Sequence, residues 1–248
     1  MTAIFWIMKI CATTLGETAG DQFAQTMKIG YAVTSVVLIG VFLITLVAQL
    51  SVRKFHPALY WTVILSTSTA GTTMSDFMDR SVGLGYAKGS LLLITGLVSV
   101  LALWRWSEGN LSVDNIHTKK AETFYWIAIL FSNTLGTAAG DFLADSSGLG
   151  FIGGAVLIGA LLLLILGATF FTKINRVLLF WLAFVLTRPF GATFGDLLTK
   201  PVAKGGLYLG TAGASLVLGG ILVALVITTM IKDARLVRGP SLSAGAEA

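Results

Sequence analysis

The stretch FWIMKICATTLGETAGD, residues 5–21, decides the fold, because its pattern recurs three times along the chain. The copies are YWTVILSTSTAGTTMSD at 60–76, YWIAILFSNTLGTAAGD at 125–141 and FWLAFVLTRPFGATFGD at 180–196. In every copy an aromatic residue and a Trp open the stretch, and an Asp follows the Trp by fifteen residues. A Gly stands five residues before each Asp, and a Gly or Ser stands one residue before it. Agreement at four places indicates an internal repeat, which governs the architecture of the whole chain.

Each motif stretch is followed by a short Gly-bearing turn and then by a plain apolar segment. These second segments cover about residues 31–52, 86–104, 151–172 and 207–231. Each repeat is therefore predicted to be a two-helix hairpin that crosses a bilayer twice. Of the 248 residues, 55% are apolar and 12% are charged, which is the composition of an integral membrane protein. The sequence thus predicts eight transmembrane helices.

The spacing of the motif Asp residues divides the chain into two halves. Successive Asp residues are 55, 65 and 55 positions apart, and the long middle gap holds the polar stretch SEGNLSVDNIHTKKAE. We expect a first half at 1–112, a cytoplasmic linker at 113–120 and a second half at 121–248, all within one integrated membrane domain. Because two spans return the chain to its starting side, the four repeats are parallel. The predicted fold is an all-α membrane bundle with pseudo-fourfold, or two-by-two, symmetry.

Basic residues predict the side of the membrane on which each loop lies. With a cytoplasmic N-terminus, inner loops and tail hold ten Lys or Arg residues and outer loops hold five, as the positive-inside rule expects. The inner set is Arg53, Lys54, Arg105, Lys119, Lys120, Lys173, Arg176, Lys232, Arg235 and Arg238, and the outer set is Lys28, Arg80, Lys88, Lys200 and Lys204. The net charge of +5 therefore reflects topology rather than a nucleic-acid partner. Both termini are predicted to be cytoplasmic.

The motif helices carry polar side chains on one face. At 100° per residue, positions three, four and seven before each Asp lie on or near the face of that Asp. In chain order these positions hold Thr18, Glu17 and Thr14; Thr73, Thr72 and Thr69; Ala138, Thr137 and Thr134; and Thr193, Ala192 and Pro189. The second segments carry few charged side chains, so we expect them to face lipid. The motif helices are then the inner ring, with their Gly and Ser residues allowing close helix contact.

Carboxylates within a membrane are costly, at about 2.5 to 3.5 kcal/mol each at a helix centre, and this chain repeats one four times. Carboxylate and hydroxyl oxygens suit Mg²⁺, Ca²⁺, Mn²⁺, Na⁺ or protons, so a cation site would compensate for the cost. The predicted ligands, including those for a metal ion, are Asp21, Asp76, Asp141, Asp196 and Glu17, helped by Thr14, Thr69 and Thr134. The alternative is structural: the Asp residues lie near helix ends, where they cap turns or pair with Lys28, Arg80 or Lys204.

Arg188 breaks the repeat, because it stands where the other copies have Thr13, Ser68 and Asn133. A buried Arg needs an acceptor, and Glu17 is the carboxylate that repeat one alone carries. We predict an ion pair between Arg188 and Glu17 that makes the ring asymmetric. The alternative acceptors are carbonyls freed near Pro189 or the Asp of a neighbouring helix.

Two features near the cytoplasmic ends of the motif helices have simple interpretations. Lys9 is predicted to extend its ammonium to the membrane interface. The repeated tryptophans are predicted to be interface aromatics rather than a cation–π gate. They are Trp6, Trp61, Trp126 and Trp181.

Four tandem copies of W-x9-G-x3-[GS]-D resemble the bacterial membrane proteins defined by a fourfold repeat of unknown function with a characteristic tryptophan. The resemblance covers the chain from Phe5 to about Met230. It implies eight spans in the bacterial cytoplasmic membrane and brings no settled activity. The acidic helices are also similar in style to metal and calcium exchangers with paired Glu-x-Gly-Asp motifs, although here Glu17 and Asp21 are four residues apart.

The expected function is transport of a small inorganic cation, with export of a divalent metal such as Mn²⁺ as the first choice and proton antiport as its coupling. The alternatives are a cation channel with an acidic ring, a carrier of an organic cation with an aromatic site, and a scaffold that transports nothing. Common catalytic and nucleotide-binding motifs are missing from the sequence, so neither an enzyme nor a cofactor is expected. The expected partners are lipid and a cation, and the sequence leaves homo-oligomer formation open.

Overall fold

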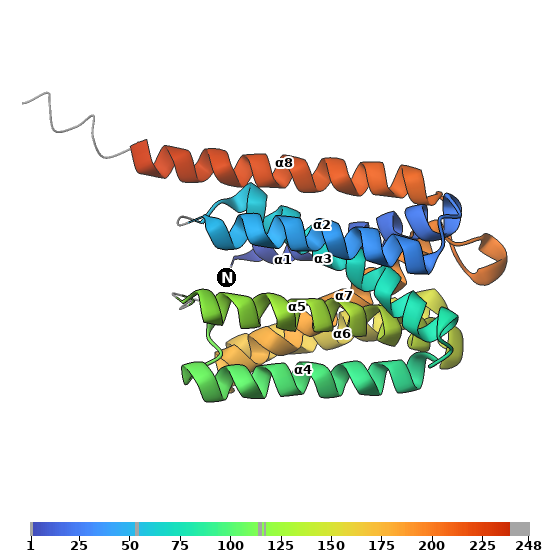
Figure 1. Ribbon diagram of the computed structural model, residues 1–248, viewed down its shortest axis with the longest axis horizontal. Coiled ribbons are helices and arrows are strands. Elements are labelled where there is room, and N and C mark those ends of the chain that lie inside the picture. The colour runs from blue at the N-terminus through green and yellow to red at the C-terminus, as the bar shows by residue number, and fades with distance from the viewer. Residues whose placement is uncertain (1, 53–54, 114–115, 117, 239–248) are drawn as a thin grey trace, which may run out of the picture.

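The computed structural model describes residues 2–52, 55–113, 116 and 118–238, which form helices joined by short turns. Arg53, Lys54 and His117, together with positions 114 and 115 of the expected linker, lie outside the described residues. Helix α1 begins at the end of the bundle at which α8 finishes, and the chain alternates between two ends (Figure 1). The described part of the chain is thus all-α, as the sequence predicts.

Eight long helices agree closely with the predicted segments. The four motif helices are α1 (Ala3–Asp21), α3 (Pro57–Asp76), α5 (Lys119–Asp141) and α7 (Arg176–Thr199). The four outer helices are α2 (Tyr31–Ser51), α4 (Tyr86–Glu108), α6 (Gly150–Phe171) and α8 (Thr211–Arg238). The turns after the motif helices use residues with positive φ, among them Gly83 and Gly85 in the second repeat, because glycine adopts this conformation without strain.

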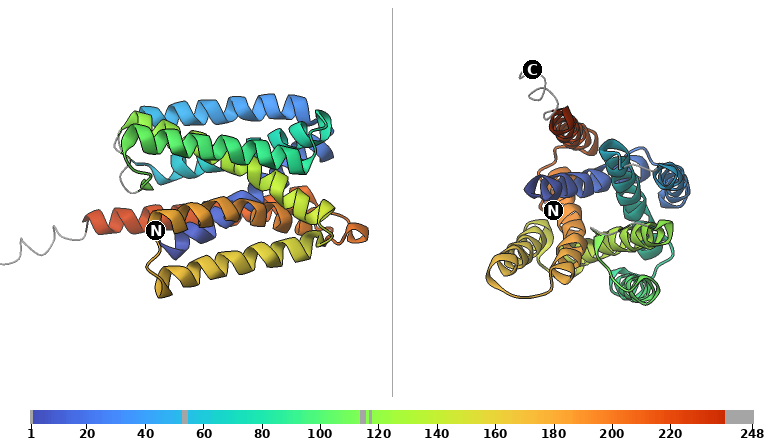
Figure 2. Two further views of the ribbon diagram at one scale, coloured as in Figure 1. Left: turned by 90° about the horizontal axis from the view of Figure 1, so that it is seen from below. Right: turned by 90° about the vertical axis from the view of Figure 1, so that its left-hand side faces the viewer.

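The motif helices form a closed inner ring. Helix α1 packs against α3, α3 against α5, α5 against α7, and α7 against α1. The end-on view in Figure 2 shows these four crossing around a common axis, with the other four outside them. Parallel repeats around an axis are the arrangement that the spacing predicts.

The outer helices link each repeat to the next one. Helix α2 packs chiefly against α3, α4 against α5 and α6 against α7, while α8 returns to pack against α1. The predicted hairpin is therefore a unit of connectivity, whereas the main packing partner of each outer helix is the following motif helix. Because α8 packs against α1, the last repeat contacts the first one and the outer layer of helices is complete.

Small residues set the spacing of the inner ring. The Gly five residues before each Asp faces the neighbouring motif helix: Gly16 faces Ser68, Gly71 faces Asn133, Gly136 faces Arg188 and Gly191 faces Thr13. A Cβ atom on Gly71 would lie 2.9 Å from the backbone nitrogen of Thr134. The four contacts repeat around the ring, which is direct evidence of its pseudo-fourfold order.

Among the described residues, six helices are long and apolar enough to cross a membrane: α2, α4, α5 with its extension, α6, α7 and α8. Between 11% and 22% of the residues in the outer spans are buried, against 50% in α7 and 61% in α5. Helices α1 and α3 fall outside this group because they carry charged and hydroxyl side chains, and they can do so because other helices surround them. The chain thus has the composition and helix lengths of a membrane protein.

Three motif helices change geometry immediately after their Asp. Helices α1, α3 and α5 continue as five-residue π-helical turns, η1 (Gln22–Thr26), η2 (Phe77–Ser81) and η4 (Phe142–Ser146). Helix α7 instead stays α-helical to Thr199, and Lys200 and Pro201 follow. Since π-turns are rare and concentrate at functional sites, the Asp positions are distinguished by their backbone as well as by their charge.

Candidate functional site

A repeated acidic layer lies at the end of the ring opposite the N-terminus. We call Asp21, Asp76, Asp141 and Asp196 the carboxylate ring. Each of the four is the last residue of its α segment or lies in the last turn, and all are at most 4% exposed. The sequence placed them at one depth, and the structure joins them through shared cationic partners.

Two cations bridge the carboxylate ring in pairs. Arg80 lies 2.9 Å from Asp76 through Nε and 2.9 Å from Asp141 through Nη2. Lys200 contacts Asp21 through Nζ and lies 3.2 Å from Asp196. Both cations follow the Asp of their own helix by four residues, in repeats two and four. The ring is therefore two-by-two in its charge pattern, although its helices are arranged fourfold.

Sequence reasoning named Arg80 as an Asp partner in the structural alternative but counted Lys200 among the loop cations. The spacing of four residues from Asp196 to Lys200, the same as from Asp76 to Arg80, was the signal that could have identified it. Burial lowers the pKa of the Lys200 ammonium, but Asp196 and Asp21 outweigh burial and raise the pKa above its ordinary value. Lys200 is thus held in its charged form.

Three carboxylates converge most closely beside Lys200. One oxygen each from Glu17, Asp21 and Asp196 lie within 4.8 Å of one another, and all three side chains are buried. Gln25 adds an amide oxygen, which accepts from Lys200 Nζ at 3.3 Å. These are hard oxygen ligands of the type that Mg²⁺, Mn²⁺ and Ca²⁺ prefer. The group holds a cation in this structure, since the Lys200 ammonium contacts it.

Arg188 and Glu17 form the next layer along the axis. Arg188 Nη1 donates to Glu17 Oε2 at 3.0 Å, so the structure contains the ion pair that the sequence predicts. Arg188 also donates to the hydroxyls of Thr72 and Thr137, the latter at 2.8 Å, and each of these hydroxyls donates to Glu17 Oε2 at 3.3 Å. Arg188 is fully buried. A guanidinium therefore closes the axis beneath the carboxylate ring.

The hydroxyl side chains that the sequence predicts as ligands do not bond to Arg188 or Glu17. Thr14, Thr69 and Thr134 are buried, but each donates to a carbonyl of its own helix, at 2.9, 2.8 and 2.9 Å. These three hydroxyls therefore bond within their own helices and not to Glu17. The hydroxyls that reach Glu17 come from Thr72 and Thr137, four residues before their Asp.

Lys9 corrects another expectation. Its side chain is fully buried, and Nζ lies 3.8 Å from the ring centroid of Phe184. The predicted extension to the membrane interface is wrong, because Lys9 lies in the middle of α1 and points among the motif helices. Within the described part of the chain, Lys9 Nζ and both polar atoms of the Asn133 amide have no hydrogen-bond partner.

The repeated tryptophans form an inner aromatic layer rather than an outward-facing belt. The residue before each Trp packs on the Trp of the next repeat: Phe5 on Trp61, Tyr60 on Trp126, Tyr125 on Trp181 and Phe180 on Trp6. Centroid distances run from 5.6 to 6.2 Å. Trp61, Trp126 and Trp181 are buried, so they pack within the bundle and not against lipid, while their depth at the membrane interface stays a prediction. The pairing of aromatic residues across each helix junction is the physical reason.

The repeats match a known family over most of the chain. The family described as Repeat of Unknown Function (DUF347) matches at residues 4–55, 59–110, 124–175 and 179–234. The chain belongs to this family, as its motif predicts, and is built of four tandem copies of the repeat. Searches of curated proteins and of solved structures gave no match.

Proposed function

We propose that this protein transports a small inorganic cation across a membrane, with export of a divalent metal such as Mn²⁺ as the first choice. The chain would cross the bacterial cytoplasmic membrane eight times, with α1 and α3 shielded by the other helices and both termini in the cytoplasm. The proposal rests on one observation: Glu17, Asp21 and Asp196 bring oxygens within 4.8 Å of one another at the end of a polar axis.

In the proposed cycle the metal ion and the Lys200 ammonium compete for the same carboxylates. Lys200 is suited to leave, because its side chain is 18% exposed and it follows the last residue of α7. Arg188 lies beneath the site, so passage of the ion requires the Arg188 and Glu17 pair to open. A proton taken up by the carboxylates as the metal leaves would provide antiport.

A scaffold is the second candidate, and the ion pairs favour it. Each carboxylate of the ring has a cation of this chain within 3.2 Å, so the negative charges of the ring are paired without a metal. Buried ion pairs can serve to specify how helices pack. A scaffold and a transporter differ in flux rather than in fold.

The test is Mn²⁺ flux into proteoliposomes that contain the purified full-length protein and an internal Mn²⁺-quenched dye. We expect saturable entry, and Asp21→Asn should lower the initial rate by about tenfold or more, because it removes one negative ligand charge. Asp145→Asn is the matched control, since Asp145 lies at the same end, is exposed and accepts from Tyr86 at 3.1 Å.

Absence of flux above protein-free vesicles would reject transport of Mn²⁺. Flux that persists when all four Asp residues of the carboxylate ring are changed to Asn would reject the site. A folded protein without flux, in which these variants lose only thermal stability, would favour the scaffold.

A further inference from the structure

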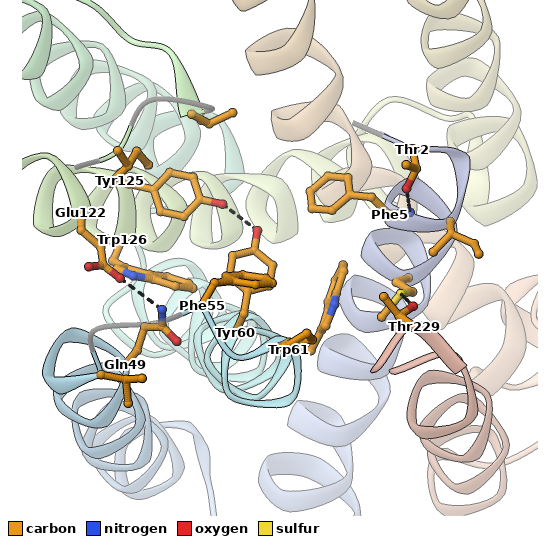
Figure 3. Close-up of a pocket in the computed structure, with 16 residues that line it drawn as sticks. Thr2, Phe5, Gln49, Phe55, Tyr60, Trp61, Glu122, Tyr125, Trp126 and Thr229 are labelled. Atoms are coloured by element: carbon orange, nitrogen blue, oxygen red, sulfur yellow. Dashed lines mark hydrogen bonds between the residues drawn. The ribbon is translucent and has the colours of Figure 1, made fainter. Parts of the chain in front are cut away.

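A cavity lies within the aromatic layer, at the opposite end of the bundle from the carboxylate ring. Its volume is about 520 Å³, within the range of small-molecule sites. Figure 3 shows Gln49 and Glu122 on one side of this cavity and Phe5 on the other, with Tyr60 and Tyr125 between them. The aromatic residues that line it are Phe5, Phe55, Tyr60, Trp61, Tyr125 and Trp126.

The cavity is open because the repeat lacks a large side chain there. In the second repeat, Trp104 of α4 is buried and packs at 5.8 Å from Trp181 and 6.4 Å from Tyr125, filling the corresponding space. With the repeats aligned on their motif Asp, Gln49 of α2 takes the place of Trp104. An amide side chain is smaller than an indole, so the space between α2 and the motif helices stays unfilled.

The third repeat supports this explanation. Its residue at the same position is Thr169, and a cavity of about 810 Å³ opens there, lined chiefly by apolar side chains and by Arg176. Both cavities therefore lie where the repeat has a smaller residue at the position of Trp104. They differ in charge, because Arg176 faces one of them and Glu122 the other.

The lining of the smaller cavity suits a cation with an apolar surface. Of the described residues around it, Glu122 alone has a charged side chain, and Gln49 Nε2 donates to Glu122 Oε1 at 3.2 Å. Aromatic faces attract cations through their quadrupole, most strongly for Trp, and quaternary ammonium groups are recognised in this way. Six rings and one carboxylate provide both the apolar contact and the charge.

We propose that this cavity binds a small alkylammonium ion, held against the aromatic rings and near the Glu122 carboxylate. The site is separate from the carboxylate ring and does not depend on metal transport. An alkylammonium suits it better than a bare metal ion, because the wall offers many carbon faces and few oxygen ligands.

The test is titration of the detergent-purified full-length protein with choline, followed by tryptophan fluorescence and calorimetry. Choline should bind saturably, and its uncharged analogue 3,3-dimethylbutanol should bind at least about tenfold more weakly, because it lacks the charge. Gln49→Trp should abolish binding, since it fills the cavity as Trp104 does in the next repeat. Glu122→Gln should weaken choline binding about tenfold and leave 3,3-dimethylbutanol unaffected.

Glu108→Gln is the matched control, because Glu108 lies at the same end of the bundle and accepts from Thr118 at 3.0 Å. Equal binding of choline and 3,3-dimethylbutanol by the wild-type protein would overturn the proposal, and this comparison needs no variant to fold. Undiminished choline binding by Gln49→Trp would also overturn it. Mn²⁺ flux with no choline binding would reject this site and leave the transport proposal intact.

Discussion

The two layers that carry buried cations on the axis of the bundle differ in how those cations are satisfied. Arg188 has Glu17, two hydroxyls and backbone carbonyls as partners. Lys9, one turn further from the carboxylate ring, has an aromatic face and no hydrogen-bond acceptor among the described residues. Both side chains are fully buried. Burial alone therefore says little about whether a charge holds the structure together.

This difference indicates which part of the polar axis stabilises the fold and which part does not. A layer with paired charges resists change, because removing one partner leaves the other buried without compensation. An unsatisfied ammonium contributes no such constraint, and its replacement by an apolar side chain should be tolerated. Three substitutions test this contrast on stability, measured by thermal or denaturant unfolding in detergent micelles.

The largest effect is expected for Arg188→Leu. The substitution leaves Glu17 buried with only hydroxyl donors, and we expect a loss of about 3 to 5 kcal/mol in the free energy of unfolding. The double variant with Glu17→Leu should recover part of the loss, because both charges are then gone. A single variant as stable as the wild type would show that the pair has no structural role.

A smaller effect is expected for Gly136→Ala, which tests the packing that brings Arg188 into its layer. The added Cβ would collide with the Arg188 side chain and approach Pro189 Cδ at 3.0 Å, so we expect a loss of about 1 to 3 kcal/mol. Gly220→Ala in α8 is the matched control. No neighbouring atom lies within 4 Å of its added Cβ, and it should gain about 0.5 to 1 kcal/mol. Equal responses of the two glycines would contradict the ring packing.

The smallest effect, and the opposite sign, is expected for Lys9→Met. Methionine keeps about the volume of the side chain and removes a buried amino group with no acceptor, so stability should be unchanged or rise by about 1 kcal/mol. A loss as large as that of Arg188→Leu would mean that Lys9 has a stabilising partner. It would contradict the difference drawn between the Arg188 layer and the Lys9 layer.

Much of the architecture could be predicted because the repeat is strong. The Trp to Asp spacing located the motif helices, and Gly16 and its equivalents predicted their close approach. The pair between Arg188 and Glu17 could be predicted because each is the exception to an otherwise regular position. Departures from a repeat are informative when two of them have complementary charge.

Other features depend on how the helices turn about their axes. The sequence predicts Thr14 as a ligand, whereas the hydroxyl that reaches Glu17 belongs to Thr72, because helical periodicity alone does not fix which of two adjacent faces meets the centre. Lys9 was placed at the interface because the sequence predicts an inner position for α1 but does not reveal that this side chain points among the motif helices. The packing of each outer helix on the next repeat likewise requires three-dimensional contacts that no local pattern encodes.

The central claim is that the carboxylates beside Lys200 form a cation site for which its ammonium competes. The most direct measurement is the Kd for Mn²⁺ of the wild-type protein and of Lys200→Met, obtained from the loss of the free Mn²⁺ signal in electron paramagnetic resonance. We expect tighter binding by Lys200→Met, and loss of that binding when Asp21→Asn is added. An unchanged Kd in Lys200→Met, or Mn²⁺ binding that ignores Asp21→Asn, would contradict it.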